Sequence, residues 1–209
     1  MANTKLERAT VGVAENGNSA VLVTIARGGK VLDRRSVDLT DGSLPTHPYH
    51  HEGSWAVGRY LNTPGARPLS LADAVALVDR VREAALRGAR ESLAELARAV
   101  PARIGAIALR ELPKLPPTTE ARITDHRAHT MADSAMYREA LALAGEEREW
   151  SVHWYDRARV FDDAARALGQ PRIDELLQQM GRSLGPPWQA RQKLAAAAAL
   201  AALGSTRAP

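Results

Sequence analysis

The chain has 209 residues, enough for one sizeable α/β core, and we expect a single domain over residues 1–209. Its 28 Lys and Arg against 24 Asp and Glu give a formal net charge of +4, which suits a nucleic-acid partner and equally suits the coding bias of a high-GC bacterial genome. The absence of cysteine excludes disulfide frameworks, thiolate nucleophiles and cysteine zinc sites.

No segment of the sequence indicates a membrane. Residues 1–8 are polar and charged, unlike the apolar centre of a signal peptide, and the alanine-rich run at 194–203 is too short to span a bilayer. We therefore expect a cytoplasmic protein with no membrane partner.

Three strands are predicted at the start of the chain. Residues 10–14, 18–26 and 30–39 are rich in Val, Ile and Leu, and Asn16-Gly17 and Gly28-Gly29 supply turns between them. We expect an antiparallel meander.

A long loop at about 40–68, rich in proline, glycine and histidine, follows the meander. Its residues His50 and His51 stand next to Glu52, and together they offer nitrogen and oxygen donors for zinc or manganese. Either histidine is also a candidate general base. Alternatively, these histidines simply pack at the surface.

The rest of the chain predicts helices and two further strands. Ser70 can cap a helix that runs to Ala99, with Asp73 favouring its first turn. Gly145 is expected to end a helix that begins near Ala128. Short apolar runs at 103–109 and 151–155 predict strands added in parallel through helical crossovers, and later helices are expected at 159–168, 173–180 and 188–203.

This order of elements, with Gly12-Val13-Ala14-Glu15, Arg110-Glu111 and a late alanine-rich helix, resembles the ribonuclease H-like superfamily, particularly its resolvase branch. The resemblance implies a mixed five-stranded sheet with flanking helices. It also implies carboxylates at the ends of the first and fourth strands and on the last helix, which in those nucleases bind Mg or Mn for phosphodiester hydrolysis.

The candidate acids match that pattern unevenly. Glu111 follows the fourth strand, where the family's second acid lies, although it could equally be a solvated carboxylate paired with Arg110 or Lys114. Ala14 stands where the first acid is expected, and Glu15, one residue later, would face the other side of the sheet unless a bulge or turn redirects it. On the last helix the acid is replaced by Gln189, Arg191, Gln192 and Lys193.

Further candidates extend this site. Asp156 follows the fifth strand and is either a helix cap or a ligand, and if the long loop folds over the strand ends, Glu52, His50 and His51 join Glu15 and Glu111. A separate cluster, Asp125-His126-Arg127-Ala128-His129 with Asp133, is either an ordinary helix start or a polar site.

A possible phosphate contact lies at the start of the last helix. Trp188 followed by Arg191 and Lys193 combines a ring with two cations at a helix N-terminus, an arrangement that attracts phosphate. Trp188 could instead anchor the helix to the core.

These observations favour a nucleic-acid-processing or binding protein, with a metal-dependent nuclease site at Glu111, Glu15, Glu52 and Asp156. One alternative is a non-catalytic adaptor with a protein partner that keeps the fold without its acids. Another is a metal-dependent small-molecule enzyme that uses the histidine-rich loop. The absence of phosphate-loop, dinucleotide and serine-nucleophile motifs disfavours nucleotide-driven motors, simple dehydrogenases and serine hydrolases.

Overall fold

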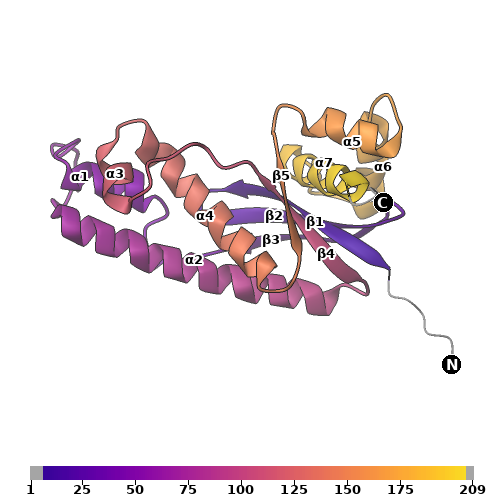
Figure 1. Ribbon diagram of the computed structural model, residues 1–209, viewed down its shortest axis with the longest axis horizontal. Coiled ribbons are helices and arrows are strands. Elements are labelled where there is room, and N and C mark those ends of the chain that lie inside the picture. The colour runs from indigo at the N-terminus through magenta and orange to yellow at the C-terminus, as the bar shows by residue number, and fades with distance from the viewer. Residues whose placement is uncertain (1–6, 206–209) are drawn as a thin grey trace.

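The computed structural model, which describes residues 7–205, is built on one mixed sheet of five strands in the order β3-β2-β1-β4-β5 (Figure 1). The meander and the two added strands confirm the predicted fold class. β1 and β2 pair antiparallel, as do β2 and β3, whereas β4 pairs parallel with both β1 and β5. The strands are β1 (Arg8–Asn16), β2 (Ser19–Ala26), β3 (Val31–Asp38), β4 (Arg103–Arg110) and β5 (Ser151–Tyr155).

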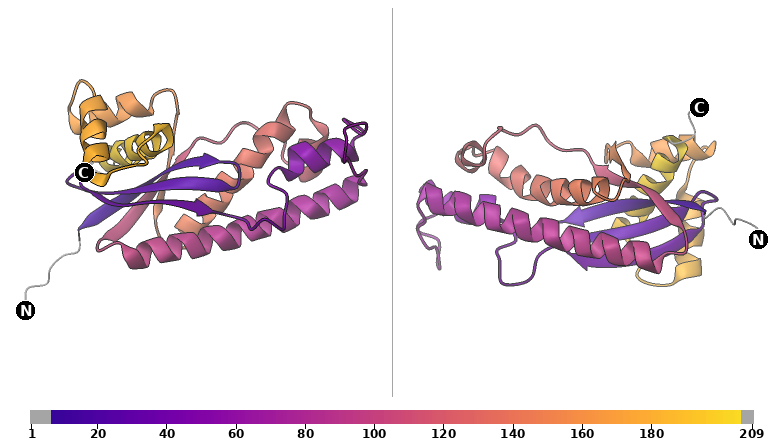
Figure 2. Two further views of the ribbon diagram at one scale, coloured as in Figure 1. Left: turned by 180° about the vertical axis from the view of Figure 1, so that it is seen from behind. Right: turned by 60° about the horizontal axis from the view of Figure 1, so that its bottom comes forward.

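Helices cover both faces of the sheet and create two separate cores (Figure 2). One face packs against α2 (Leu71–Ala99) and α4 (Ala128–Glu146), and the other against α5 (Val160–Leu168), α6 (Asp174–Leu184) and α7 (Ala190–Ser205). Because side chains alternate along a strand, β1 places Val11 and Val13 in the α2/α4 core and Ala14 in the α7 core. This alternation decides where every polar residue at the strand ends points.

The α7 helix lies directly on β1, at Gly12. A Cβ at that position would clash with the carbonyl oxygen of Ala195 and would lie 2.7 Å from the backbone nitrogen of Ala199. The alanine run at 195–199, which is fully or almost fully buried, allows this close approach of helix and strand. The predicted alanine-rich helix is therefore the part of the fold that most closely approaches the sheet.

The α2 helix extends past the sheet, and short helices gather against its first turns (Figure 1). They are a π-helix, η1 (Pro48–Glu52), followed by α1 (Gly53–Ala56) and α3 (Thr119–Thr124). Ser70 caps α2 as predicted, because its hydroxyl accepts a hydrogen bond of 3.1 Å from the Asp73 amide. The region at 40–68 is thus partly helical, a departure from the expected loop that follows from the burial of Pro48 and Tyr49.

Gly145 does not end α4 as the sequence predicted. The helix continues to Glu146, and Gly145 is buried where a Cβ would lie 2.9 Å from Cγ2 of Ile107. The glycine serves close packing of α4 on β4 rather than termination. Among residues 7–205, no helix combines the length and apolar character needed to cross a membrane.

The contact of α7 with β1 makes Gly12→Ala a test of the fold. The added methyl group has no space, so we expect a loss of about 1–3 kcal/mol in the free energy of unfolding, measured by urea denaturation. Gly105→Ala, at a strand glycine with nothing within 4 Å of the new methyl, is the matched control and should not be destabilised. Equal stability of the two variants would contradict the packing described.

Candidate functional site

A buried ion pair organises the carboxyl ends of β1 and β4. Nε of Arg138, on α4, lies 3.0 Å from Oε1 of Glu15, and the two side chains are only 4% and 5% exposed. This contact is an ion pair without hydrogen-bond geometry, because Nε has no hydrogen-bond partner within residues 7–205. Burial lowers the pKa of Arg138, while the Glu15 carboxylate acts in the opposite direction.

Arg138 also joins this pair to the end of β4. Its Nη1 donates a hydrogen bond of 2.5 Å to the main-chain oxygen of Glu111, while the Glu111 amide donates to the Tyr155 oxygen at 3.0 Å. The structure therefore brings Glu15 and Glu111 together around one arginine. Arg138 was not among the residues predicted from the sequence, although it is an arginine among the buried residues of α4.

An open cleft of about 460 Å³ lies beside this arginine. Arg110 and Arg157 bring further positive charge to it, Thr130 and Ser134 contribute hydroxyl groups, and Met131 is 40% exposed. Within residues 7–205, neither Arg110 nor Arg157 forms a hydrogen bond or ion pair through its guanidinium. We call this the strand-end cleft.

On the face of the sheet under α7, the ends of β1 and β4 present no carboxylate within residues 7–205. Ala14 lies in the α7 core, and alternation along β4 directs Arg110 to the same side as Ala108. Glu15 points instead to the α4 side, as its one-residue offset predicted, because β1 runs without a bulge beside β2 up to Asn16. Ala14 thus occupies the position where the resemblance implies the first acid, and Arg110 ends β4 directly before Glu111, where it implies the second.

Tyr155, the last residue of β5, connects this strand to β1. Its hydroxyl donates a hydrogen bond of 2.8 Å to the Val13 carbonyl, and burial raises its pKa above the ordinary value, with a further contribution from Glu15. This tyrosine is held as a neutral donor at neutral pH.

Asp156 stabilises the turn after β5. Its Oδ1 accepts a hydrogen bond of 2.8 Å from the Ala158 amide, and its Oδ2 lies 3.0 Å from Nε of Arg159. The pKa of Asp156 is lowered chiefly by the amide of Ala158. Asp156 lines the strand-end cleft, yet its oxygens are already engaged within the turn.

The predicted histidine cluster forms elsewhere, at the first turns of α4. Oδ1 of Asp133 accepts from the Tyr49 amide at 2.9 Å and Oδ2 from the His50 amide at 3.2 Å, so this buried carboxylate holds η1 against α4. Burial raises the pKa of Asp133 to about 7. Neither His50 nor His51 lines the strand-end cleft.

His129 is the buried centre of this cluster. Its ring centroid lies 4.8 Å from that of His50 and 5.5 Å from that of His126, and both of its nitrogens are buried without a hydrogen-bond partner among the described residues. Burial, with smaller contributions from His50 and Arg59, lowers the pKa of His129 to about 4. The ring is therefore neutral at physiological pH.

The remaining loop candidates surround this cluster. His51 stacks on Trp55 and lies 3.8 Å from Glu52, whose pKa is raised by burial. Asp125 caps the start of α4 by accepting from the amides of Arg127 and Ala128. Throughout the described part of the chain, no three His, Asp or Glu side chains are placed to share one metal ion.

Arg34, on β3, forms hydrogen bonds with the segment that precedes α7. Arg34 donates through Nη1 to the carbonyls of Gly185 at 2.9 Å and Pro187 at 2.7 Å. Trp188 packs where a Cβ on Gly181 would stand, which agrees with its role as an anchor. Arg191 is exposed and lines a shallow hollow beside β2 and β3, while Lys193 is partly buried.

The strand ends do not fit a divalent metal. Mg²⁺ and Mn²⁺ require several oxygen ligands, whereas Ala14 stands in place of the first acid, Glu15 is paired with Arg138, and Asp156 is engaged within its own turn. Glu111 alone remains as an exposed carboxylate among the predicted strand-end acids. The arrangement suits anions better than cations, because three arginines converge on the strand-end cleft.

Two solved structures of RuvC from Thermus thermophilus resemble this chain. One is a complex with a Holliday junction substrate, with 14% sequence identity, coverage of 96% of this chain and 95% of that chain, and a TM-score of 0.50. The other matches with 15% identity, 95% coverage of both chains and a TM-score of 0.48. No family model and no curated protein sequence matches. The likeness to the complex confirms the predicted ribonuclease H-like fold.

Removing one member of the buried pair should cost more than removing both. Arg138→Met leaves the Glu15 carboxylate buried without a counter-charge, so we expect the free energy of unfolding to fall by about 3–5 kcal/mol. The double variant Glu15→Gln/Arg138→Met should recover most of this loss in urea denaturation. Arg90→Met, which breaks the exposed pair with Glu147, is the control and should change stability little. Equal losses in the single and double Arg138 variants would contradict the pairing.

Asp133 and His129 should have opposite effects on stability as pH changes. The raised pKa of Asp133 gives stability that is complete below its ordinary value of 3.8 and is lost as pH rises through about 7. The lowered pKa of His129 gives stability that is present above 6.5 and is lost as pH falls through about 4.

Single substitutions separate the two effects. In urea denaturation across this pH interval, Asp133→Asn should become less stable as pH falls, and His129→Leu should become less stable as pH rises. The wild type should show the flattest profile of the three, because its two slopes oppose each other. Parallel profiles for all three proteins would exclude these titrations.

Proposed function

We propose that this protein binds nucleic acid at the strand-end cleft and does not hydrolyse it by a metal-dependent mechanism. The observation that supports this most directly is the charge at the strand ends: Ala14 stands where the first acid is expected, Arg138 neutralises Glu15, and Arg110 precedes Glu111 at the end of β4. A phosphodiester backbone is the polyanion that such a site fits.

The cleft offers the contacts that a nucleic-acid backbone needs. Arg110 and Arg157 form no side-chain hydrogen bond or ion pair in the described part of the chain, and Thr130 and Ser134, on α4, add hydroxyl groups to the same cleft. Arginine binds phosphate oxygens through two parallel hydrogen bonds, which favours a phosphodiester over a simple carboxylate.

Apolar surface lies next to these cations. Leu112 and Met131 are 39% and 40% exposed at the cleft, where they can contact sugars or unstacked bases. The fold-level likeness to a RuvC bound to a Holliday junction substrate adds support for a branched duplex as ligand. Glu111 is exposed at the rim, and we propose that it orients the ligand through repulsion rather than by holding a metal.

Binding and cleavage can be tested separately. Fluorescence anisotropy with labelled four-way junction, duplex and single-stranded DNA and RNA should show binding in EDTA, and gels of the same mixtures with Mn²⁺ should show no cleavage. Arg110→Gln/Arg157→Gln should weaken binding several-fold and lower the salt dependence by about two phosphate contacts, because each lost contact removes counterion release.

The control is Arg80→Gln, at an exposed arginine of α2 outside the cleft, which should bind like the wild type. Binding that is unaffected by the double substitution would exclude the cleft as the interface. Cleavage that requires Mn²⁺ and disappears in Glu111→Gln would instead establish the nuclease that the sequence analysis favoured.

A further inference from the structure

A row of three arginines crosses the sheet at the opposite end of β1. Arg8 opens β1 and is the register partner of Arg103 on β4, while the amide of Arg27, just after β2, donates a hydrogen bond of 2.9 Å to the Arg8 carbonyl. Ala9 and Ile104, the next residues, both belong to the α2/α4 core, so alternation directs Arg8 and Arg103 to the α7 side. Neighbouring strands are about 4.8 Å apart, which places these like charges close together.

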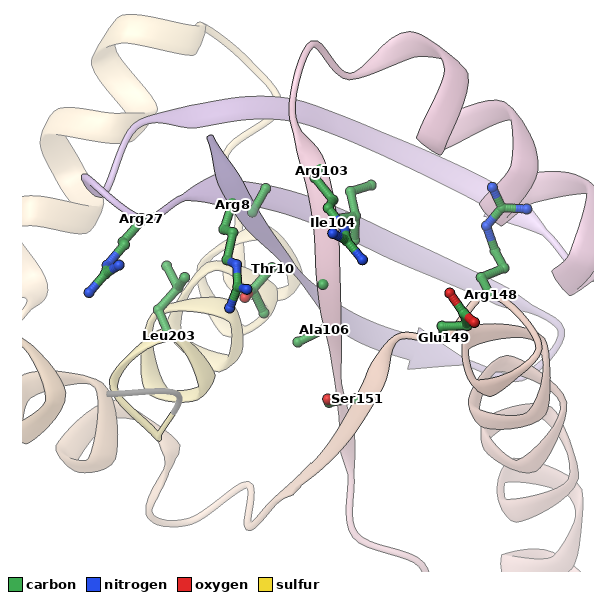
Figure 3. A pocket seen from close by; sticks show the side chains of 12 residues that line it. Arg8, Thr10, Arg27, Arg103, Ile104, Ala106, Arg148, Glu149, Ser151 and Leu203 are labelled. Carbon is green, nitrogen blue, oxygen red and sulfur yellow. The ribbon is translucent and has the colours of Figure 1, made fainter. Parts of the chain in front are cut away.

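These arginines line a partly open pocket of about 220 Å³ (Figure 3). Arg148 and Glu149, from the turn after α4, also belong to its lining. The hydroxyl groups of Thr10 and Ser151 complete the polar part of the wall.

The positive charge of the pocket is not balanced within residues 7–205. Neither Arg8, Arg27 nor Arg103 forms a side-chain hydrogen bond or ion pair there. Arg148 stacks over the Trp150 ring at 5.4 Å, but its buried Nε has no partner among the described residues. The negative end of the α7 dipole, near Leu203, offsets only part of this charge.

Like charges at paired positions of a sheet destabilise it unless something neutralises them. A bound anion would do so, and the size of the pocket restricts which one. Its volume is below the roughly 300 Å³ at which sites for drug-sized ligands begin, so a single phosphate fits better than a whole nucleotide. The guanidinium groups of Arg8 and Arg103, with the hydroxyl groups of Thr10 and Ser151, supply donors for the oxygens of a phosphate group.

We propose that this pocket is a phosphate-binding site formed by Arg8 and Arg103, with Arg27 and Arg148 adding positive charge around it. It is separate from the strand-end cleft, because the two lie at opposite ends of β1 and β4. The phosphate comes either from a free anion such as inorganic phosphate or pyrophosphate, or from a nucleic-acid backbone that reaches this end of the sheet.

The first test uses the thermal unfolding midpoint in phosphate and in chloride at equal ionic strength. Phosphate should raise the wild-type midpoint in a concentration-dependent manner, since a ligand that binds only the folded state stabilises it. Arg8→Gln/Arg103→Gln should lose this rise. In chloride alone the double variant should be at least as stable as the wild type, because it removes repulsion between paired arginines.

Arg80→Gln again supplies the matched control and should keep the full response to phosphate. Arg110→Gln/Arg157→Gln should also keep it, which separates this site from the proposed nucleic-acid interface. Isothermal titration with inorganic phosphate and pyrophosphate should give binding to the wild type and none to Arg8→Gln/Arg103→Gln. A wild type without any phosphate response, or an equal response in Arg8→Gln/Arg103→Gln, would overturn the proposal.

Measuring the affinity of the same variants for duplex DNA distinguishes a free anion from a backbone phosphate. If Arg8→Gln/Arg103→Gln loses both the phosphate response and DNA affinity, the pocket binds a backbone phosphate. If it loses the phosphate response and binds DNA like the wild type, the ligand is a free anion. Both results support the phosphate site, and neither depends on Arg110 or Arg157.

Discussion

The direct packing of α7 on β1 is the constraint on which the other features of this structure depend. Gly12 leaves no space for a side chain beneath the alanine run of α7, so the α7 side of β1 is fixed by steric contact. Alternation then places Ala14 on that side and Glu15 on the side of α4. Since the carboxylate of Glu15 enters an apolar interior there, Arg138 is needed on α4 to compensate for its charge. A steric contact in the middle of the strand thus determines the electrostatics at its end.

Positive charge is concentrated at both ends of the parallel strands, which the modest net charge of +4 does not reveal. At the carboxyl ends, Arg110 and Arg157 lie beside the neutralised pair, and at the amino ends Arg8 and Arg103 stand at paired positions. Arg8, Arg103 and Arg110 lie on strands, so their spacing is set by the sheet. A coding bias toward arginine would raise the number of arginines but would not explain this placement.

Much of the fold could be predicted because it depends on local signals. Asn16-Gly17 fixed the first turn, and Ser70 with Asp73 fixed the start of α2. The errors arose where distant segments decide the structure. Gly145 has the local signature of a helix end, yet its contact with Ile107 keeps it inside α4. The same holds for the functional site. Alternation along β1 correctly predicted the direction of Glu15, but the residue that pairs with it, Arg138, lies 123 positions away in the sequence and could not be predicted from a local pattern.

The strand ends also indicate why a single substitution would not recreate a metal site on this scaffold. An aspartate at position 14 would lie on the α7 side, where alternation also directs Arg110, and opposite charges at neighbouring strand ends attract each other. The new carboxylate would be neutralised by that arginine, just as Glu15 is neutralised by Arg138 on the other face. A metal would also require a further acid near the start of α7, where Gln189, Arg191 and Lys193 now stand. The arginines at the strand ends therefore favour an anionic ligand at both ends of β1 and β4.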